Sequence, residues 1–246
     1  MLMTARDGLH PGTASQPPWD AFNLGNHVGD EPADVQRHRE ELAAALQAQP
    51  VWLQQVHGNR VVRLSSQTLT TLAETQADGA VTTEPGLVCA IMVADCLPIL
   101  LAAPEGRGVA ALHAGWRGLA GAADLNGLGI AHTGVAALCE AASCDPVDLR
   151  AWLGPCIGPT AFQVGPDVLS GFGVDPAQSH PRFIPQSANR WLADLAGLAA
   201  DRLQTLGLHR IEGGHWCTVS APSRFFSFRR DRVTGRQAAC IWLTGL

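Results

Sequence analysis

The pattern of apolar and polar positions in the first half of the chain predicts one helix followed by a series of short strands. Val35, Leu42 and Leu46 recur at helical spacing after Pro32, a residue suited to a first helical turn, and predict a helix over 32–49. Short apolar runs then predict strands over 51–53, 60–64, 79–82, 87–93, 98–102 and 109–113.

The second half of the chain has longer helical patterns. A Gly/Ala-rich stretch over 119–142 predicts a helix that Asn126, Gly127 and Gly129 interrupt near its middle. Residues 149–153 and 238–243 predict strands. The strongest helical pattern covers 189–206, where Gly207 ends an apolar stripe formed by Leu192, Leu195, Ala199, Leu203 and Leu206.

These elements predict one α+β domain over residues 21–246, with mixed β-sheets flanked by helices. The sequence has no repeat of fixed period, no low-complexity tract and no linker long enough to separate two domains. A chain of 246 residues can bury roughly 70% of its unfolded surface, so a sizeable core is available. Residues 1–20 are rich in Pro, Gly, Ser and Thr, and predict a flexible N-terminal arm.

Composition and charge exclude several classes of protein and several catalytic groups. The net charge of −5 argues against a nucleic-acid partner, and no apolar run approaches the ~20 residues that span a bilayer. The first residues lack the pattern of a signal peptide, so we expect a cytoplasmic protein. All 17 basic residues are Arg and there is no Tyr, which excludes Lys and Tyr as bases, acids or nucleophiles.

The cysteines argue against a disulfide scaffold. There are seven of them, an odd number, and none forms a Cys-x-x-Cys pair. Reduced thiols in a reducing compartment fit this count better than disulfides or a four-thiolate zinc knuckle. Catalysis is therefore left to Cys, His, carboxylates, Ser, Thr and Arg.

Three short segments place a His or Cys at the end of a predicted strand. They contain His57, Cys96 and His113, each next to Gly, Pro or Asp. Two His and one thiolate could hold zinc and leave its fourth position open, as in catalytic zinc sites. The separations of 39 and 17 residues match no short metal motif. Isolated buried residues, or Cys96 as a thiolate nucleophile beside a His base, fit the same pattern.

The chain resembles the YfiH-like family, which is also described as the laccase-domain or multicopper polyphenol oxidase family, as peptidoglycan editing factor, and as purine nucleoside phosphorylase of the adenosine-phosphorylase type. The matching segments follow the family's order over almost the whole chain beyond the arm. They are Asn23–Gly25, Val28–Asp30, Trp52–Gly58, Ala77–Gly79, Ala94–Pro98, His113–Gly118, Gly154–Pro159, Cys217–Thr218 and Phe225–Leu243.

The resemblance implies that His57, Cys96 and His113 bind one zinc ion in a YfiH-like fold and form the catalytic centre. It also suggests polar groups that line the substrate pocket and guanidinium groups that bind phosphate or carboxylate. These candidate substrate-binding residues are Asn23, Gln54, Arg117, Arg224, Arg229 and Arg230. For Asn23 and Gln54 the alternatives are a turn-forming Asn and a satisfied strand-end amide. For the arginines the alternative is ion pairing with Asp231 or solvent exposure, and Phe225, Phe226 and Phe228 could stack a base or pack in the core.

The activity that the resemblance implies is phosphorolysis of adenosine, inosine, guanosine and methylthioadenosine, together with deamination of adenosine. A nucleoside and phosphate would then be the partners, with neither nucleic acid nor membrane, and a monomer is the default. The alternatives are an amidase-like hydrolase that edits peptidoglycan precursors, a copper polyphenol oxidase and a binding module. Copper is disfavoured because a multicopper oxidase needs several His-rich clusters. The general acid and base stay open among His, carboxylates and water.

The sequence departs from the family's usual pattern at a few positions. Residues 124–132 resemble an insertion, Phe228 and Val219 stand where Tyr is usual, and Gln163 replaces an acidic residue. None of them is one of the three expected ligands, so these departures concern substrate preference rather than the metal.

Overall fold

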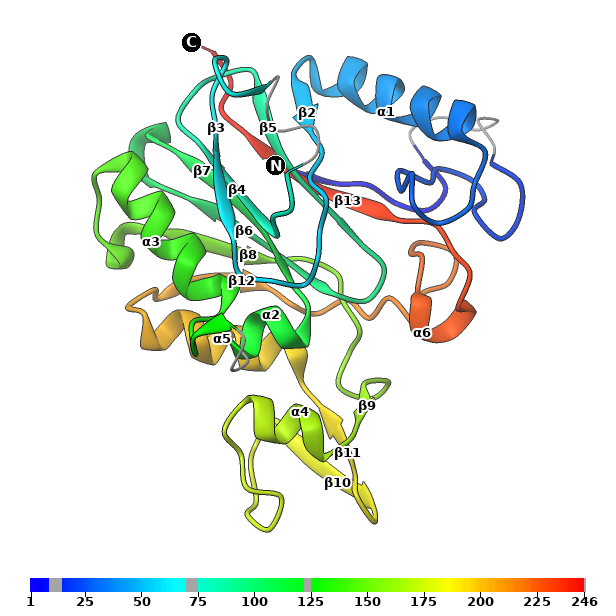
Figure 1. Cartoon of the computed structure of the whole chain (residues 1–246), viewed down its shortest axis with the longest axis vertical. Coiled ribbons are helices and arrows are strands. Elements are labelled where there is room, and N and C mark those ends of the chain that lie inside the picture. Colours follow the sequence, from blue (N-terminus) through cyan, green and yellow to red (C-terminus); the bar gives the residue numbers. More distant parts are fainter. Residues whose placement is uncertain (9–14, 70–74, 122–124, 246) are drawn as a thin grey trace.

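The computed structural model describes residues 1–8, 15–69, 75–121 and 125–245. Two mixed sheets form its centre, and a third, smaller sheet lies at one end (Figure 1). The larger central sheet has the strand order β12-β8-β6-β7-β4-β3, and the other has the order β1-β13-β5-β2. Both combine parallel and antiparallel neighbours, so the predicted α+β domain with mixed sheets is confirmed.

The strands of the six-stranded sheet are β3 (Val61–Leu64), β4 (Gly79–Thr82), β6 (Leu97–Ala102), β7 (Val109–Ala114), β8 (Arg150–Leu153) and β12 (Arg210–Gly213). The four-stranded sheet contains β1 (Leu2–Met3), β2 (Gln49–Val51), β5 (Leu87–Val93) and β13 (Gln237–Trp242). The small sheet contains β9 (Gln163–Val164), β10 (Phe183–Ser187) and β11 (Arg190–Ala193). The helices are α1 (Pro32–Leu46), α2 (Trp116–Ala120), α3 (Ile130–Ala142), α4 (Pro166–Gly171), α5 (Leu195–Thr205) and α6 (Phe228–Asp231), with 3₁₀ turns at Pro104–Gly106 and Pro146–Asp148.

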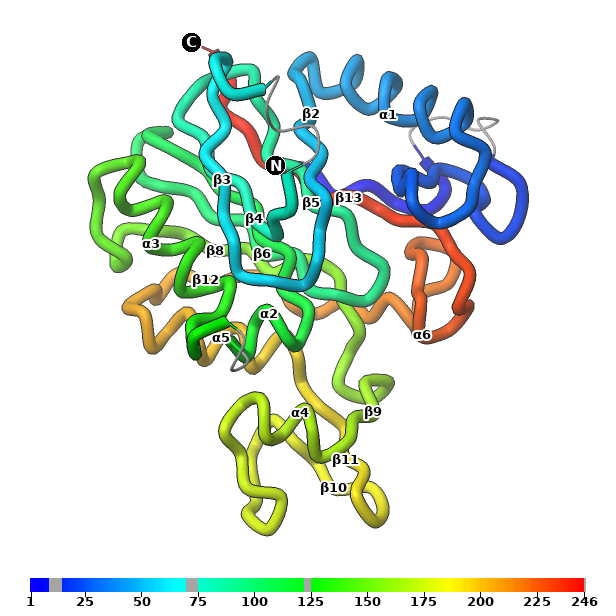
Figure 2. Tube along the Cα trace, viewed as in Figure 1, coloured from blue at the N-terminus to red at the C-terminus, as the bar shows by residue number. Residues whose placement is uncertain are grey.

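The two central sheets pack face to face and helices cover their outer faces, as the trace in Figure 2 shows. Strand β5 shows how the layers form, because its alternate residues enter two different apolar clusters. Cys89 and Ile91 pack between the sheets, whereas Val88 and Ala90 pack with Leu42 of α1. A strand that is buried on both faces has a continuous apolar sequence, which explains the run over 87–93. Helices α3 and α5 cover the outer face of the six-stranded sheet.

Most predicted elements are confirmed, and β4 and β5 have the predicted bounds. Helix α1 ends at Leu46 rather than residue 49, because Gln47 adopts a left-handed conformation with φ 49°. The break near Asn126–Gly129 separates α2 from α3 as expected. Residues 122–124, which include the first residue of the predicted insertion, lie outside the described residues.

The predicted helix over 189–206 is wrong in its first third. Residues 190–193 form β11, which pairs with β10 and β9, and the helix begins only at Leu195. The side chain of Asp194 accepts a hydrogen bond from the Gly197 amide and caps the helix. Leu192 happens to fit the helical stripe, but it belongs to the strand.

Part of the predicted N-terminal arm is integrated in the fold. Leu2 and Met3 pair with Cys240 and Ala239 of β13, and Thr4 is buried. The backbone amide of Arg6 also donates to the Arg224 carbonyl. Residues 9–14 of the arm lie outside the described residues. Within the described part of the chain, no helix is both long enough and apolar enough to cross a membrane.

Candidate metal centre and adjoining cavity

His57, Cys96 and His113 meet at one edge of the six-stranded sheet. Pro98 at the start of β6 is paired with His113 near the end of β7, which brings the Cys96 turn to the ring of His113. The turn that contains His57 leads into β3, whose first residue pairs with the start of β4. Their ligand atoms all lie within 4.8 Å of one another. The sheet register therefore brings together three residues that are far apart in sequence.

The donor set is compatible with zinc. Ligands at about 2.3 Å for sulfur and about 2.0 Å for nitrogen, on one tetrahedral ion, lie about 3.5 Å apart. Cys96 Sγ and His57 Nε2 are 3.6 Å apart. The Nδ1 atom of His113 is hydrogen-bonded to Asp78, so its Nε2 atom is the one left for a metal, an arrangement usual for ligating histidines.

Asp78 holds two of the three segments in place. It is fully buried, and Oδ1 lies 2.7 Å from His113 Nδ1. The same carboxylate accepts hydrogen bonds from the backbone amides of Val56, His57 and Gly58 at 2.7–3.1 Å. His57 has a positive φ of 62°, so the turn needs such support. Sequence reasoning missed this role, although the Ala77–Gly79 segment was among the matched stretches.

The charges at the cluster favour a thiolate. Burial opposes ionisation of Cys96, but the charge of His113 and hydrogen bonds to His113 and His57 lower its pKa to about 6. Burial likewise opposes protonation of His113, yet the Cys96 charge and the hydrogen bond to Asp78 raise its pKa. Burial raises the pKa of Asp78, but the bond to His113 and the backbone amides lower it below its usual value overall. The thiol is thus prepared to ligate a metal or to act as a nucleophile.

Two glycines let helix α2 approach the cluster closely. A Cβ atom on Gly115 would lie 2.8 Å from the His57 ring and 3.2 Å from Cys96 Sγ. On Gly118 it would lie 2.7 Å from the Gly58 carbonyl oxygen. The spacing of these glycines after His113 therefore has a steric reason.

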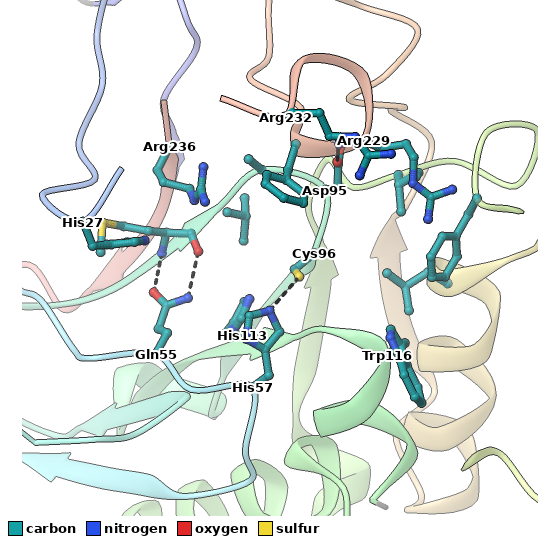
Figure 3. Close-up of a pocket in the computed structure, with 17 residues that line it drawn as sticks. His27, Gln55, His57, Asp95, Cys96, His113, Trp116, Arg229, Arg232 and Arg236 are labelled. Atoms are coloured by element: carbon teal, nitrogen blue, oxygen red, sulfur yellow. Dashed lines mark hydrogen bonds between the residues drawn. The ribbon is translucent and has the colours of Figure 1, made fainter. Parts of the chain in front are cut away.

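The cluster opens into a cavity of about 420 Å³. Figure 3 shows Gln55, His27 and Arg236 on one side of the cluster, with Trp116 and Arg229 on the other. Phe162 and Phe228 also line it, and Phe228 is 48% exposed. The amide of Gln55 exchanges two hydrogen bonds of 2.8 Å with the Met92 backbone and fixes one wall. The cavity thus combines a candidate metal-ligand set, aromatic rings and guanidinium groups.

Comparison with known proteins places this chain in a family. The profile of the family described as "Multi-copper polyphenol oxidoreductase laccase" matches residues 2–244. Purine nucleoside phosphorylase YfiH of Escherichia coli K12 is 44% identical over 237 residues, which cover 94% of this chain and 90% of that protein. The chain belongs to the YfiH-like family. A purine nucleoside phosphorylase of Pseudomonas aeruginosa is 42% identical over 94% of this chain and 90% of its own length.

Solved structures of similar proteins share the fold. A Neisseria meningitidis protein is 38% identical with a TM-score of 0.85, over 99% of this chain and 93% of that one. The Bacillus licheniformis hypothetical protein YfiH is 29% identical with a TM-score of 0.87, over 98% and 91% of the two chains. The YfiH-like fold predicted from the sequence is confirmed.

The structure separates the expected substrate-binding residues into two groups. Arg229 lines the cavity; its amide donates to Asp95 Oδ2 and its Nη1 atom to the Gln163 carbonyl. Gln54 lines a neighbouring cavity, while Gln55 lines both. The other four do not line either cavity: Asn23, Arg117, Arg224 and Arg230.

Asn23 and Arg230 have structural roles instead. Asn23 is fully buried. Its side-chain nitrogen donates to the Gly25 carbonyl and the Asp30 carboxylate, and its side-chain oxygen accepts from the backbone amides of Gly25 and Arg236. Arg230 donates to three backbone carbonyl oxygens and to the carboxylate of Asp231. These roles are the alternatives that the sequence left open: a turn-forming Asn for Asn23, and ion pairing with Asp231 for Arg230.

Arg117 and Arg224 each lie near an aromatic ring and do not line the cavity. Arg117 lies 5.7 Å from the centre of the Trp116 ring, and Arg224 lies 4.4 Å from that of Trp216. Of the three phenylalanines considered, Phe225 and Phe226 are in the core and Phe228 faces the cavity. Sequence reasoning missed His27, Arg232 and Arg236 as lining residues.

Proposed function

We propose that this chain is a zinc-dependent purine nucleoside phosphorylase that acts on adenosine, inosine, guanosine and methylthioadenosine, and that it also deaminates adenosine. The observation that carries the proposal is the His57–Cys96–His113 cluster at the base of a cavity with aromatic and guanidinium walls. The names of the E. coli and P. aeruginosa relatives support the phosphorylase activity. We place the reaction in the cytoplasm, with a nucleoside and phosphate as the small-molecule partners.

His57, Cys96 and His113 would hold the zinc ion. A bound zinc would supply a Lewis acid that activates an oxygen nucleophile at neutral pH. Asp78 keeps the His113 ring and the His57 turn in their ligating orientation through the bonds described above. The thiolate of Cys96 adds the negative charge that a dication requires.

The remaining walls suit a purine nucleoside. Trp116, Phe162 and Phe228 place aromatic rings in the cavity wall, against which a planar base can pack. Asp95 accepts hydrogen bonds from the Thr218 hydroxyl and the Arg229 amide, and so fixes the segment that carries Arg229. Phosphorolysis joins phosphate to the anomeric carbon and releases the base, whereas deamination replaces the amino group of adenosine with oxygen from water.

We propose zinc rather than copper. The family description names copper, but among the described residues there is one group of three such ligands, and a multicopper oxidase needs several His-rich clusters. Elemental analysis of protein purified without added metal should give about one zinc per chain. Several copper ions per chain would overturn the metal assignment.

The activity is tested by incubating the zinc protein with adenosine, with and without phosphate, and separating the products. Adenine and ribose 1-phosphate should rise with phosphate and saturate, and inosine should form without it. Both routes should fall together in His57→Ala and His113→Ala. His209→Ala is the matched control, because His209 is exposed and does not line the cavity. Adenine formation at an equal rate without phosphate would show a hydrolase instead.

A second candidate is an amidase-like hydrolase in which Cys96 attacks the carbonyl of a peptidoglycan precursor. The lowered pKa of Cys96 and the His113–Asp78 pair favour it, because a thiolate beside an oriented imidazole is a nucleophile arrangement. Cys96→Ala separates the two. It should lose zinc if Cys96 is a ligand, and keep zinc while losing cleavage of an L-Ala-L-Ser muropeptide precursor if Cys96 is the nucleophile.

A further inference from the structure

A second cavity adjoins the one at the metal cluster. It has a volume of about 470 Å³ and shares His27, Gln55 and Met92 with the first. Arg39 and Trp52 complete its polar and aromatic walls. In Figure 3, His27 and Arg236 lie next to each other on this side of the cluster, away from Trp116. His27 therefore stands at the junction of the two cavities.

Two arginines near this junction are hydrogen-bonded to neutral groups. Arg39 donates from Nε and Nη2 to the Leu24 carbonyl oxygen at 2.9 and 2.8 Å, and lies 4.5 Å from the centre of the Trp52 ring. Arg236 donates from Nη1 to the carbonyl oxygens of Thr234 and Gly235, and its Nε and Nη2 atoms have no partner among the described residues. Both arginine residues are half-buried.

No carboxylate within the described residues pairs with either arginine. Arg182 and Arg230, which are also partly buried, do have such partners at 2.7–2.9 Å. The one carboxylate that lines either cavity is Asp95, and the Thr218 hydroxyl and Arg229 amide occupy its two oxygens. A half-buried guanidinium that lacks a directly paired carboxylate is costly, so an anionic ligand in contact with it would relieve that cost.

The electrostatic environment of the junction agrees with this interpretation. Burial lowers the pKa of Arg39 to about 10. Burial also lowers the pKa of Arg236, and the negative charges of Cys96 and Asp95 oppose this shift only in part. Burial, followed by the charges of Arg236 and Arg39, also lowers the pKa of His27. Both arginines thus act on His27, which can donate a neutral N–H beside two guanidinium forks. Guanidinium groups match the geometry of phosphate oxygens.

We propose that Arg39 and Arg236, with His27 at the junction, form a binding subsite for a phosphoryl group. The inference rests on the proposed phosphorylase function, where inorganic phosphate is the co-substrate. The phosphoryl group of a nucleoside 5′-monophosphate has the same chemistry. In either case the anion lies on the His27 side of the cluster, and the base lies on the opposite side with Trp116 and Phe162.

A binding measurement tests the subsite without relying on catalysis. The melting temperature of the zinc protein is followed against inorganic phosphate, and separately against adenosine 5′-monophosphate, with chloride at equal ionic strength as the reference. Phosphate should raise the melting temperature saturably. The apparent Kd should rise at least tenfold in Arg39→Met and in Arg236→Met. Arg37→Met is the matched control, since Arg37 lies on the same helix, pairs with Asp34 and lines neither cavity; its Kd should not change.

The outcomes keep the two proposals apart. If phosphate binding depends on both arginines but no nucleoside is consumed, the subsite stands and the phosphorylase function fails. If adenosine is phosphorolysed and the KM for phosphate is unchanged in both variants, the function stands and the subsite is overturned. A response to adenosine 5′-monophosphate alone, lost in both variants, assigns the phosphoryl group to the substrate. Should Arg236→Met fail to fold, Arg236→Lys keeps the charge without the fork and should still weaken binding.

Discussion

Carboxylates support both the candidate metal-binding edge of the six-stranded sheet and the region beside the small sheet of β9, β10 and β11, but in opposite settings. Asp78 is fully buried and serves His113 and three backbone amides. Beside the small sheet, Arg182, which precedes β10, binds Asp194 at the start of α5 and Asp201 within α5 at 2.8–2.9 Å. Here 32% of the side chain of Arg182 and 44% of that of Asp201 are exposed. A buried carboxylate has no water to replace a lost partner. Loss of a hydrogen-bond partner therefore lowers stability much more at the candidate metal-binding edge than beside the small sheet.

The largest effect is expected from Asp78→Ala. It removes the acceptor of a buried imidazole and of three amides, and breaking a buried pair costs about 3–5 kcal/mol. We expect a loss of that size in the free energy of unfolding, together with loss of bound metal. Denaturant titration and elemental analysis measure the two. Asp78→Asn keeps one acceptor oxygen and should be less destabilised; equal stability of Asp78→Ala and wild type would refute the role of this network.

A smaller effect is expected at the neighbouring residues Arg229 and Arg230, where one substitution should change KM and the other should change stability. Arg230→Met removes charged hydrogen bonds to backbone carbonyls and should destabilise the fold by about 2 kcal/mol with an unchanged KM. Arg229→Met should leave the fold intact and raise the KM for the nucleoside roughly tenfold, which corresponds to about 1.4 kcal/mol. Steady-state kinetics and denaturant titration of both variants test this. The same change in KM and in the free energy of unfolding for both variants would contradict it.

The smallest effect is expected in the small sheet. Arg182→Met should lower the free energy of unfolding by about 1 kcal/mol, because half-exposed ion pairs are screened by water. The hydrogen bond from Arg182 is the main reason that the pKa of Asp201 is lowered. This contribution is therefore present above the ordinary carboxyl pKa and is lost as the pH falls through the folded-state pKa. The difference between wild type and Arg182→Met should shrink on acidification, and a difference that grows would exclude the ion pair as its source.

The sequence predicted the elements whose pattern is set by burial. The strand at 87–93 is a continuous apolar run, and the strand at 79–82 is interrupted only by Thr82, as burial on both faces requires. Residues 190–193 were misassigned because Leu192 and Leu195 also satisfy a helical period. Pairing with β10, a tertiary contact, decides their conformation, and local pattern does not contain that information.

The candidate site was predicted unevenly for a related reason. The three candidate ligands stand at strand ends in recognisable segments, and the sheet register brings them together as expected. Which arginine points into the cavity depends on the orientation of α6 and on the path of the chain that follows it. Arg229 and Arg236 face it while Arg230 turns to the Thr218 and Phe225 carbonyls. No difference in residue type distinguishes these positions in the sequence.

The position of β13 has a consequence for synthesis of the chain on the ribosome. This last strand lies between β1 and β5, so the four-stranded sheet cannot close until residues 237–242 have emerged. Until then β5 has an unpaired edge, which can pair with other chains. Three arginines that line the cavity come shortly before β13 in the sequence: Arg229, Arg232 and Arg236. This part of the cavity wall therefore forms at the same late stage as the closing of the sheet. A nascent chain that stops before residue 229 would contain all three candidate ligands and still lack both the cavity and a closed sheet.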